Sequence, residues 1–244
     1  MIALTLDVDW APDSILRSVL SVLDNYCVPA TLFCTNYVKD LSGNSSNLSS
    51  LVDPRHELGL HPDFQGVMDY SRVWDELINL YPTARGWRSH NGVTGWPIVK
   101  EGVARGLGYE VFSPVFEGYV PPSQVNGALP GYLGFSTAFW DSHRLHDASF
   151  GWRAKDLPLT EHFFDPGKLV VLGFHPNILY YDMRMVSEYE ARKPRYHEPD
   201  EGGSFLNRPA QGAMRLLIDL LNSVTSAHFC TIAAFNERMG HWKK

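Results

Sequence analysis

The sequence predicts an α/β fold built on a parallel sheet that is closed or nearly closed. Short apolar segments alternate along the chain with segments whose apolar residues recur at helical spacing. Several apolar segments run directly into acidic residues or histidines, as happens where strands end at a functional edge. The 244 residues contain no internal repeat and no clear boundary, so we expect one domain over residues 1–244.

The expected strands are short. They cover residues 2–6, 30–34, 57–60, 109–112, 169–174 and 229–233. The segment 169–174 contains no charged or hydrogen-bonding side chain, which is typical of a strand buried on both faces. The first strand leads into Asp7-Val8-Asp9 and therefore ends at a polar site.

Apolar residues at helical spacing predict four helices between these strands. The stripes are Ile15, Leu16, Val19, Leu20 and Leu23; Val73, Trp74, Leu77 and Ile78; Ile98, Val99 and Val103; and Met214, Leu217, Leu220, Leu221 and Val224. Asp13 or Ser14 is the expected N-cap of the first helix, and Pro97 suits the first turn of the third. Residues 40–50 and 187–204 are expected to form surface loops. The alternative for residues 187–204 is a mobile flap beside a site.

Composition excludes some classes of partner. The formal net charge is −6, and Lys and Arg form no run that would bind nucleic acid or an anionic membrane. No signal peptide or membrane-spanning segment is evident. Cys27, Cys34 and Cys230 match neither a disulfide framework nor a metal motif, so we expect buried thiols in a reducing compartment. We therefore expect a cytoplasmic protein.

Asp7 and Asp9 form the first candidate site. Residues i and i+2 of a strand point to the same face, so the two carboxylates are expected to lie together. Two neighbouring carboxylates repel each other unless one is protonated or a cation binds them. A divalent ion bound by one carboxylate, with the other acting as base, resolves this conflict. The alternative is a pair of capping or turn aspartates.

Histidines provide the remaining candidates. His61 ends a short strand and is a possible zinc ligand, whereas His56 points to the opposite face and is expected to be packed or at the surface. His90 is either a third ligand or a substrate contact, and Arg88 is expected to orient Asp7 and keep it ionised. His175 directly follows the apolar strand at 169–174, where it would serve as general acid for a leaving amine.

Taken in order, these motifs resemble the polysaccharide deacetylases, the NodB-homology group of carbohydrate esterase family four. The shared features are D-x-D, A-T-L-F, H-E-L-G-L-H, R-S-H and a strand ending in His, from Leu4 to about Ala233. The resemblance implies a single distorted (β/α) TIM-like barrel of about seven strands. It also implies that Asp7 is the catalytic base, that Asp9 and His61 bind a metal, and that His175 is the acid.

The chain departs from the family pattern at several motifs, most clearly at two. The family's second metal-binding histidine falls on Gln65, a poor zinc ligand, so His90 or Asp63 is expected to replace it. We favour His90, because its imidazole keeps the usual nitrogen donor. The family's aspartate-tryptophan motif has no clean counterpart, and Trp140-Asp141-Ser142-His143 is the nearest candidate.

The resemblance implies a metal-dependent hydrolase, with zinc as the default ion, that removes an N-acetyl group from an amino sugar. The substrate is expected to be a small carbohydrate, free or linked to a nucleotide or lipid, in polysaccharide or lipopolysaccharide synthesis. Trp10, Trp87 and Trp140 are candidates for stacking on the sugar. The alternatives are a deformylase or other non-peptide amidohydrolase using the same site, and an inactive barrel that binds a glycan.

Overall fold

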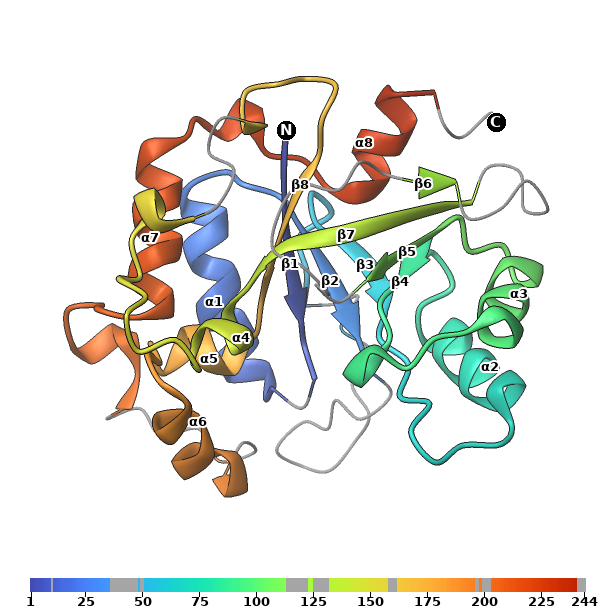
Figure 1. The fold of residues 1–244 in the computed structure, drawn as a ribbon, viewed down its shortest axis with the longest axis horizontal. Coiled ribbons are helices and arrows are strands. Elements are labelled where there is room, and N and C mark those ends of the chain that lie inside the picture. The colour runs from blue at the N-terminus through green and yellow to red at the C-terminus, as the bar shows by residue number, and fades with distance from the viewer. Residues whose placement is uncertain are drawn as a thin grey trace.

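The protein folds around a parallel β-barrel (Figure 1). The computed structural model describes residues 1–9, 11–35, 48, 51–112, 123–124, 132–157, 162–195, 198 and 203–240. Its strands are β1 (Ile2–Asp7), β2 (Ala30–Cys34), β3 (Glu57–Leu60), β4 (Gly86–Trp87), β5 (Tyr109–Phe112), β6 (Ser123–Gln124), β7 (Leu133–Trp140) and β8 (Val170–Phe174).

The described strands follow the order β5-β4-β3-β2-β1-β8-β7-β6. An additional parallel pairing between β5 and β7 closes seven strands into a barrel, and β6 adds to β7 in antiparallel orientation. The predicted closed α/β barrel is therefore confirmed. Two of its strands were missed: β4 is only two residues long, and β7 carries Ser136 and Thr137 among its apolar residues.

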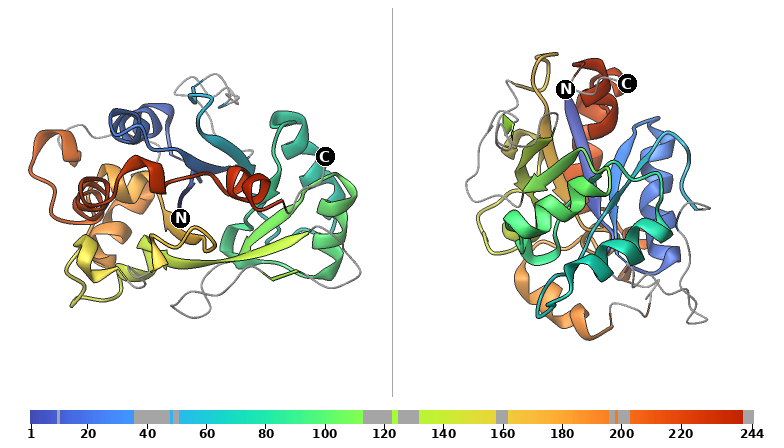
Figure 2. Two further views of the ribbon diagram at one scale, coloured as in Figure 1. Left: turned by 90° about the horizontal axis from the view of Figure 1, so that it is seen from above. Right: turned by 90° about the vertical axis from the view of Figure 1, so that its right-hand side faces the viewer.

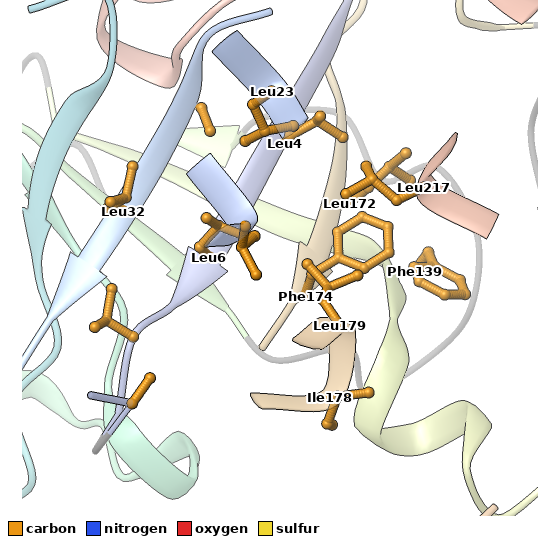
Figure 3. Close-up of a cluster of buried hydrophobic side chains, with 14 of the residues drawn as sticks. Leu4, Leu6, Leu23, Leu32, Phe139, Leu172, Phe174, Ile178, Leu179 and Leu217 are labelled. Atoms are coloured by element: carbon orange, nitrogen blue, oxygen red, sulfur yellow. The ribbon is translucent and has the colours of Figure 1, made fainter. Parts of the chain in front are cut away.

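Alternation along the strands separates two cores. On β1, Ala3 belongs to a cluster inside the barrel, whereas Leu4 and Leu6 belong to the cluster between the barrel and its helices. Gly86 on β4 has no side chain because the ring of Tyr109 fills that space; an added Cβ would lie 2.1 Å from the ring. Figure 3 shows the outer cluster, in which Leu4, Leu172 and Phe174 meet Leu23 and Leu217.

Helices cover the barrel on two flanks (Figures 1 and 2). One flank carries α1 (Asp13–Asn25), α5 (Pro176–Tyr180) and α7 (Ala213–Ser223), and the other carries α2 (Tyr70–Leu80) and α3 (Trp96–Ala104). The chain also forms α4 (Asp141–Arg144), α6 (Val186–Arg192) and α8 (Ile232–Arg238). The four predicted helices correspond to α1, α2, α3 and α7, and Pro97 lies in the first turn of α3 as expected.

The last predicted strand, 229–233, is wrong. Phe229 makes only an isolated bridge to Ile2, because β1 is already paired with β2 on one side and β8 on the other. From Ile232 the chain forms α8, whose N-cap Thr231 accepts a hydrogen bond from the amide of Ala234. Ile232 and Phe235 join the interior cluster, so α8 closes the end of the barrel where the strands begin (Figure 1).

Two smaller predictions also change, and a third is not tested. Helix α1 begins at Asp13 after Pro12, without a side-chain cap, so neither Asp13 nor Ser14 is the N-cap. Asp13 instead lies in the first turn, where its negative charge interacts favourably with the helix dipole and stabilises the helix. Of the cysteines, Cys34 is buried but Cys27 is exposed. The loop expected at 40–50 lies outside the described residues, except for Leu48, which is buried.

Candidate active site

The candidate site lies at the carboxyl ends of the strands, where parallel barrels carry their functional groups. A cavity of about 350 Å³ is lined by residues at or just after the ends of β1, β3, β4, β7 and β8, and by Tyr189 of α6. Its described lining consists of Asp7, Asp9, His61, His90, Asn91, Gly92, Trp140, Ser142, His143, His175 and Tyr189. Five of the six predicted site residues therefore line one cavity, and Arg88, the sixth, is fully buried against Asp7.

Backbone hydrogen bonds extend the sheet into the site. The amide of His61 donates to the carbonyl of Cys34, and the amide of Arg88 donates to that of Leu60. Beyond the strands, the amide of His90 donates to the carbonyl of Pro62. The loops after β3 and β4 are thereby held side by side, which brings His61 and His90 together from positions 29 residues apart.

Asp9, His61 and His90 form a group in which one possible ligand atom from each residue lies within 4.8 Å of the others. His61 Nε2 lies 3.1 Å from Asp9 Oδ1, and His90 Nδ1 lies 3.4 Å from the same oxygen. His61 Nδ1 donates to the carbonyl of Arg88 at 2.6 Å. In the neutral ring this bond leaves Nε2 free to coordinate, an arrangement common among metal-ligating histidines.

The chemistry of this group fits a divalent metal ion. Asp9 Oδ1 is buried and makes no hydrogen bond, although two imidazole nitrogens face it. Burial would raise the pKa of Asp9, but His61 and His90 outweigh it and hold the pKa well below its ordinary value. An ionised carboxylate and two imidazoles are three of the donors typical of catalytic zinc.

The other two candidates for the third ligand lie outside this group. Gln65 is exposed, and its side-chain oxygen accepts a hydrogen bond from Asn91 at 3.2 Å. The carboxylate of Asp63 accepts from the amide of Gln65 in a local turn. Asn91 has a left-handed backbone (φ 54°), a conformation that asparagine tolerates, in the short 3-10 helix that begins at His90. The geometry therefore favours His90.

Asp7 and Arg88 form a buried ion pair beside this group. Arg88 Nη1 donates to Asp7 Oδ1 at 2.6 Å, and both side chains are at most 1% exposed. The other carboxylate oxygen, Oδ2, is buried without a hydrogen bond and lies 4.0 Å from His175 Nε2. Since Asp9 Oδ2 lies 3.8 Å from the same nitrogen, the two aspartates face one site, as predicted.

Asp141 is the functional residue that the sequence analysis left out of the site. Its carboxylate accepts from His175 Nδ1 at 2.6 Å and from the His175 amide at 2.7 Å. Burial alone would lower the pKa of His175, but Asp141, with Asp9 and Asp7, raises it to about 9. The Trp140 ring stacks on that of His175. Trp140 and Asp141, the nearest sequence candidates for the aspartate-tryptophan motif, therefore both contact His175.

The remaining candidates divide between core and cavity. His56 is packed as expected, with its Nδ1 accepting from the amide of Ala30. Trp87 is fully buried and donates to the hydroxyl of Tyr132, so it is core and does not contact a sugar. Trp10 lies outside the described residues. Tyr189 reaches the cavity from α6, so the segment expected as a loop begins as a helix beside the site.

A closed parallel barrel that gathers aspartates and histidines at its strand ends is typical of the NodB-type barrels. A comparison with protein families confirms this class: residues 4–193 match the sequence profile of the WbmS-like polysaccharide deacetylases. The chain belongs to this family of polysaccharide deacetylases. No curated protein matches the sequence.

Solved structures show the same fold. A protein described as a polysaccharide deacetylase involved in O-antigen biosynthesis, from Bordetella bronchiseptica, superposes with a TM-score of 0.73 at 23% identity, over 91% of this chain and 90% of that one. A polysaccharide deacetylase structure from Mycobacterium smegmatis has a TM-score of 0.58 at 15% identity, over 97% and 88%. A carbohydrate esterase family four pseudoenzyme from Bacillus anthracis has a TM-score of 0.50 at 14% identity, over 96% and 64%.

Proposed function

We propose that this protein is a metal-dependent hydrolase that removes an N-acetyl group from an amino sugar of a polysaccharide or lipopolysaccharide precursor in the cytoplasm. The observation that carries the proposal is the convergence of Asp9, His61 and His90 beside Asp7 and His175 in one cavity. No helix among the described residues is long and apolar enough to cross a bilayer.

Asp9, His61 and His90 are the proposed metal ligands, and zinc is the ion that this donor set suits best. When bound, the ion supplies polarisation of the amide carbonyl and makes water more acidic. Within the protein, the bond from His61 to the Arg88 carbonyl orients one ligand, and the bond from the His90 amide to the Pro62 carbonyl fixes the backbone of another.

Asp7 is the proposed base that removes the proton of the attacking water. Its Oδ2 atom is buried, faces the cavity's polar groups and has no hydrogen-bond partner, so it can accept that proton. Arg88 balances the charge of the carboxylate and holds its other oxygen.

His175 is the proposed acid that protonates the departing amine as the carbon–nitrogen bond breaks. An amine is too basic to leave as an anion, so the reaction needs a proton donor on the leaving-group side. The hydrogen bond to Asp141 places the other ring nitrogen, Nε2, toward Asp7 and Asp9. In the metal-free protein, a pKa of about 9 keeps His175 protonated near neutral pH.

The test begins with divalent metal in protein purified without chelators. We expect near-stoichiometric metal in the parent, loss of metal in Asp9→Ala, His61→Ala and His90→Ala, and retention in the matched control Gln65→Ala. Retention in His90→Ala with loss in Gln65→Ala would reassign the third ligand. An absence of metal, even after zinc is added, would contradict the proposal and leave a glycan-binding barrel.

The acyl group is tested next on the metal-loaded protein. Acetate and formate are measured after incubation with amino sugars that are free, nucleotide-linked or lipid-linked and carry either acyl group. We expect acetate release that Asp7→Asn abolishes. Release of formate alone would identify a deformylase using the same residues.

A further inference from the structure

Arg88 binds Asp7 through a single hydrogen bond, which is unusual for this pair of side chains. Arginine and carboxylate groups frequently form two parallel bonds. Here Nη1 donates to Asp7 Oδ1, whereas Nη2 donates to the hydroxyls of Thr5 at 2.9 Å and Thr137 at 3.1 Å. The second carboxylate oxygen is left without a partner although it is buried.

The two threonine hydroxyls can only accept from Arg88. A hydroxyl has one hydrogen, and each of these hydrogens is used elsewhere: Thr5 donates to the carbonyl of Leu172, and Thr137 donates to that of Phe112. Both threonines are fully buried, so water does not replace them. The two hydrogens of Nη2 therefore have one acceptor each.

The barrel fixes the position of both acceptors. Thr5 lies on β1 two residues before Asp7, and its partner Leu172 lies on the neighbouring strand β8. Thr137 lies on β7, and its partner Phe112 lies on β5, the strand that closes the barrel. The guanidinium also packs against the rings of Phe33 and Trp140, with centroids 4.6 and 5.1 Å from its central carbon.

We propose that Thr5 and Thr137 are positioning residues that hold Arg88 in its single bond to Asp7 and so keep Asp7 Oδ2 available as the proton acceptor. The inference rests on the proposed function of Asp7 as base. If one hydroxyl is removed, a buried hydrogen of Nη2 loses its acceptor. Oδ2 is the free acceptor on the same carboxylate, so the guanidinium turns to form two bonds with Asp7 and occupies that atom.

The first test is structural and needs no substrate. Crystal structures of the parent, Thr137→Val and Thr137→Ser are compared for the distance between Arg88 Nη2 and Asp7 Oδ2. We expect hydrogen-bonding distance in Thr137→Val, which keeps the shape of the side chain but has no acceptor, and the parental arrangement in Thr137→Ser. An unmoved guanidinium in Thr137→Val overturns the inference. Thr5→Val and Thr137→Ala remove the same acceptors and carry the test if Thr137→Val does not fold.

The second test measures turnover of 4-nitrophenyl acetate by zinc-loaded protein. Nitrophenolate leaves without a proton from His175, so this probe isolates the step assigned to Asp7. We expect kcat to fall about ten-fold or more in Thr137→Val and to recover in Thr137→Ser, with unchanged zinc content. Thr31→Val is the matched control, because it removes a fully buried hydroxyl whose hydrogen bonds are with Glu57 and with the amide of Ile232 rather than with Arg88.

The outcomes separate the two proposals. Equal losses in Thr137→Val and Thr31→Val would show a general effect on folding and overturn the inference. Loss of turnover in Asp7→Asn but parental turnover in Thr137→Val would overturn only the inference. Turnover unchanged in Asp7→Asn would overturn the base assignment, while the crystal structures still decide whether the threonines position Arg88.

Discussion

The carboxylates at the two ends of the barrel differ in their hydrogen bonding. At the amino end, Glu57 accepts hydrogen bonds from the hydroxyls of Thr31 and Tyr109 and from the amide of Ala233 in α8. At the carboxyl end, Asp7 Oδ2 and Asp9 Oδ1 are buried without a hydrogen bond. Native proteins rarely leave buried polar atoms unpaired. The fully hydrogen-bonded Glu57 therefore has a structural role, whereas the unpaired oxygens of Asp7 and Asp9, which line the cavity, are available to a ligand.

Matched replacement of an acid by its amide sharpens this comparison, and the largest effect is expected at Asp7. Asp7→Asn should lower the rate of acetate release by about a thousand-fold, because the amide does not act as a base. The free energy of unfolding should also fall, by about 3 kcal/mol, because the buried guanidinium of Arg88 loses its counter-charge. The rate is measured under saturating zinc, and unfolding by urea titration.

The second effect concerns protonation at the carboxyl end. In metal-free protein, an NMR titration of the His175 ring should give a midpoint near 9, and Asp141→Asn should lower it, because burial then dominates. The pKa is raised above that of the unfolded chain. Protonated His175 therefore contributes stability that is fully present below about 6.5 and is lost as pH rises through about 9. Equal midpoints in the two proteins would contradict the assigned effect of Asp141.

The smallest effect is expected at the amino end. Glu57→Gln should lower the free energy of unfolding by about 2 kcal/mol. Both carboxylate oxygens of Glu57 accept hydrogen bonds, and the substitution turns one of them into an NH2 group, so at least one buried donor loses its acceptor. Zinc content and acetate release should stay at parental levels. A loss of metal in this variant would show that the two ends are coupled, and the comparison between them would fail.

Local pattern was enough to predict most of the barrel and part of the site. Strands β1, β2 and β8 are uninterrupted runs of buried residues, β3 and β5 are short and partly buried, and α1, α2, α3 and α7 have apolar stripes. A few neighbouring residues therefore identify each element. Strand β7 was missed because its inward position 137 is a threonine, and that threonine binds Arg88. The residue that interrupts the apolar pattern of this strand is therefore one that contacts Arg88 beside the candidate site.

The sequence by itself determined that Asp7, Asp9, His61 and His175 lie at or just beyond the ends of strands, in motifs that resemble those of the deacetylases. The tertiary structure alone decided that His90 joins Asp9 and His61 while Gln65 is exposed, and that Asp141 binds His175. Helical and strand periodicity depends on residues close in the chain. Contacts between loop residues depend instead on which strands are neighbours and on how their loops leave the sheet, and spacing in the sequence does not record either.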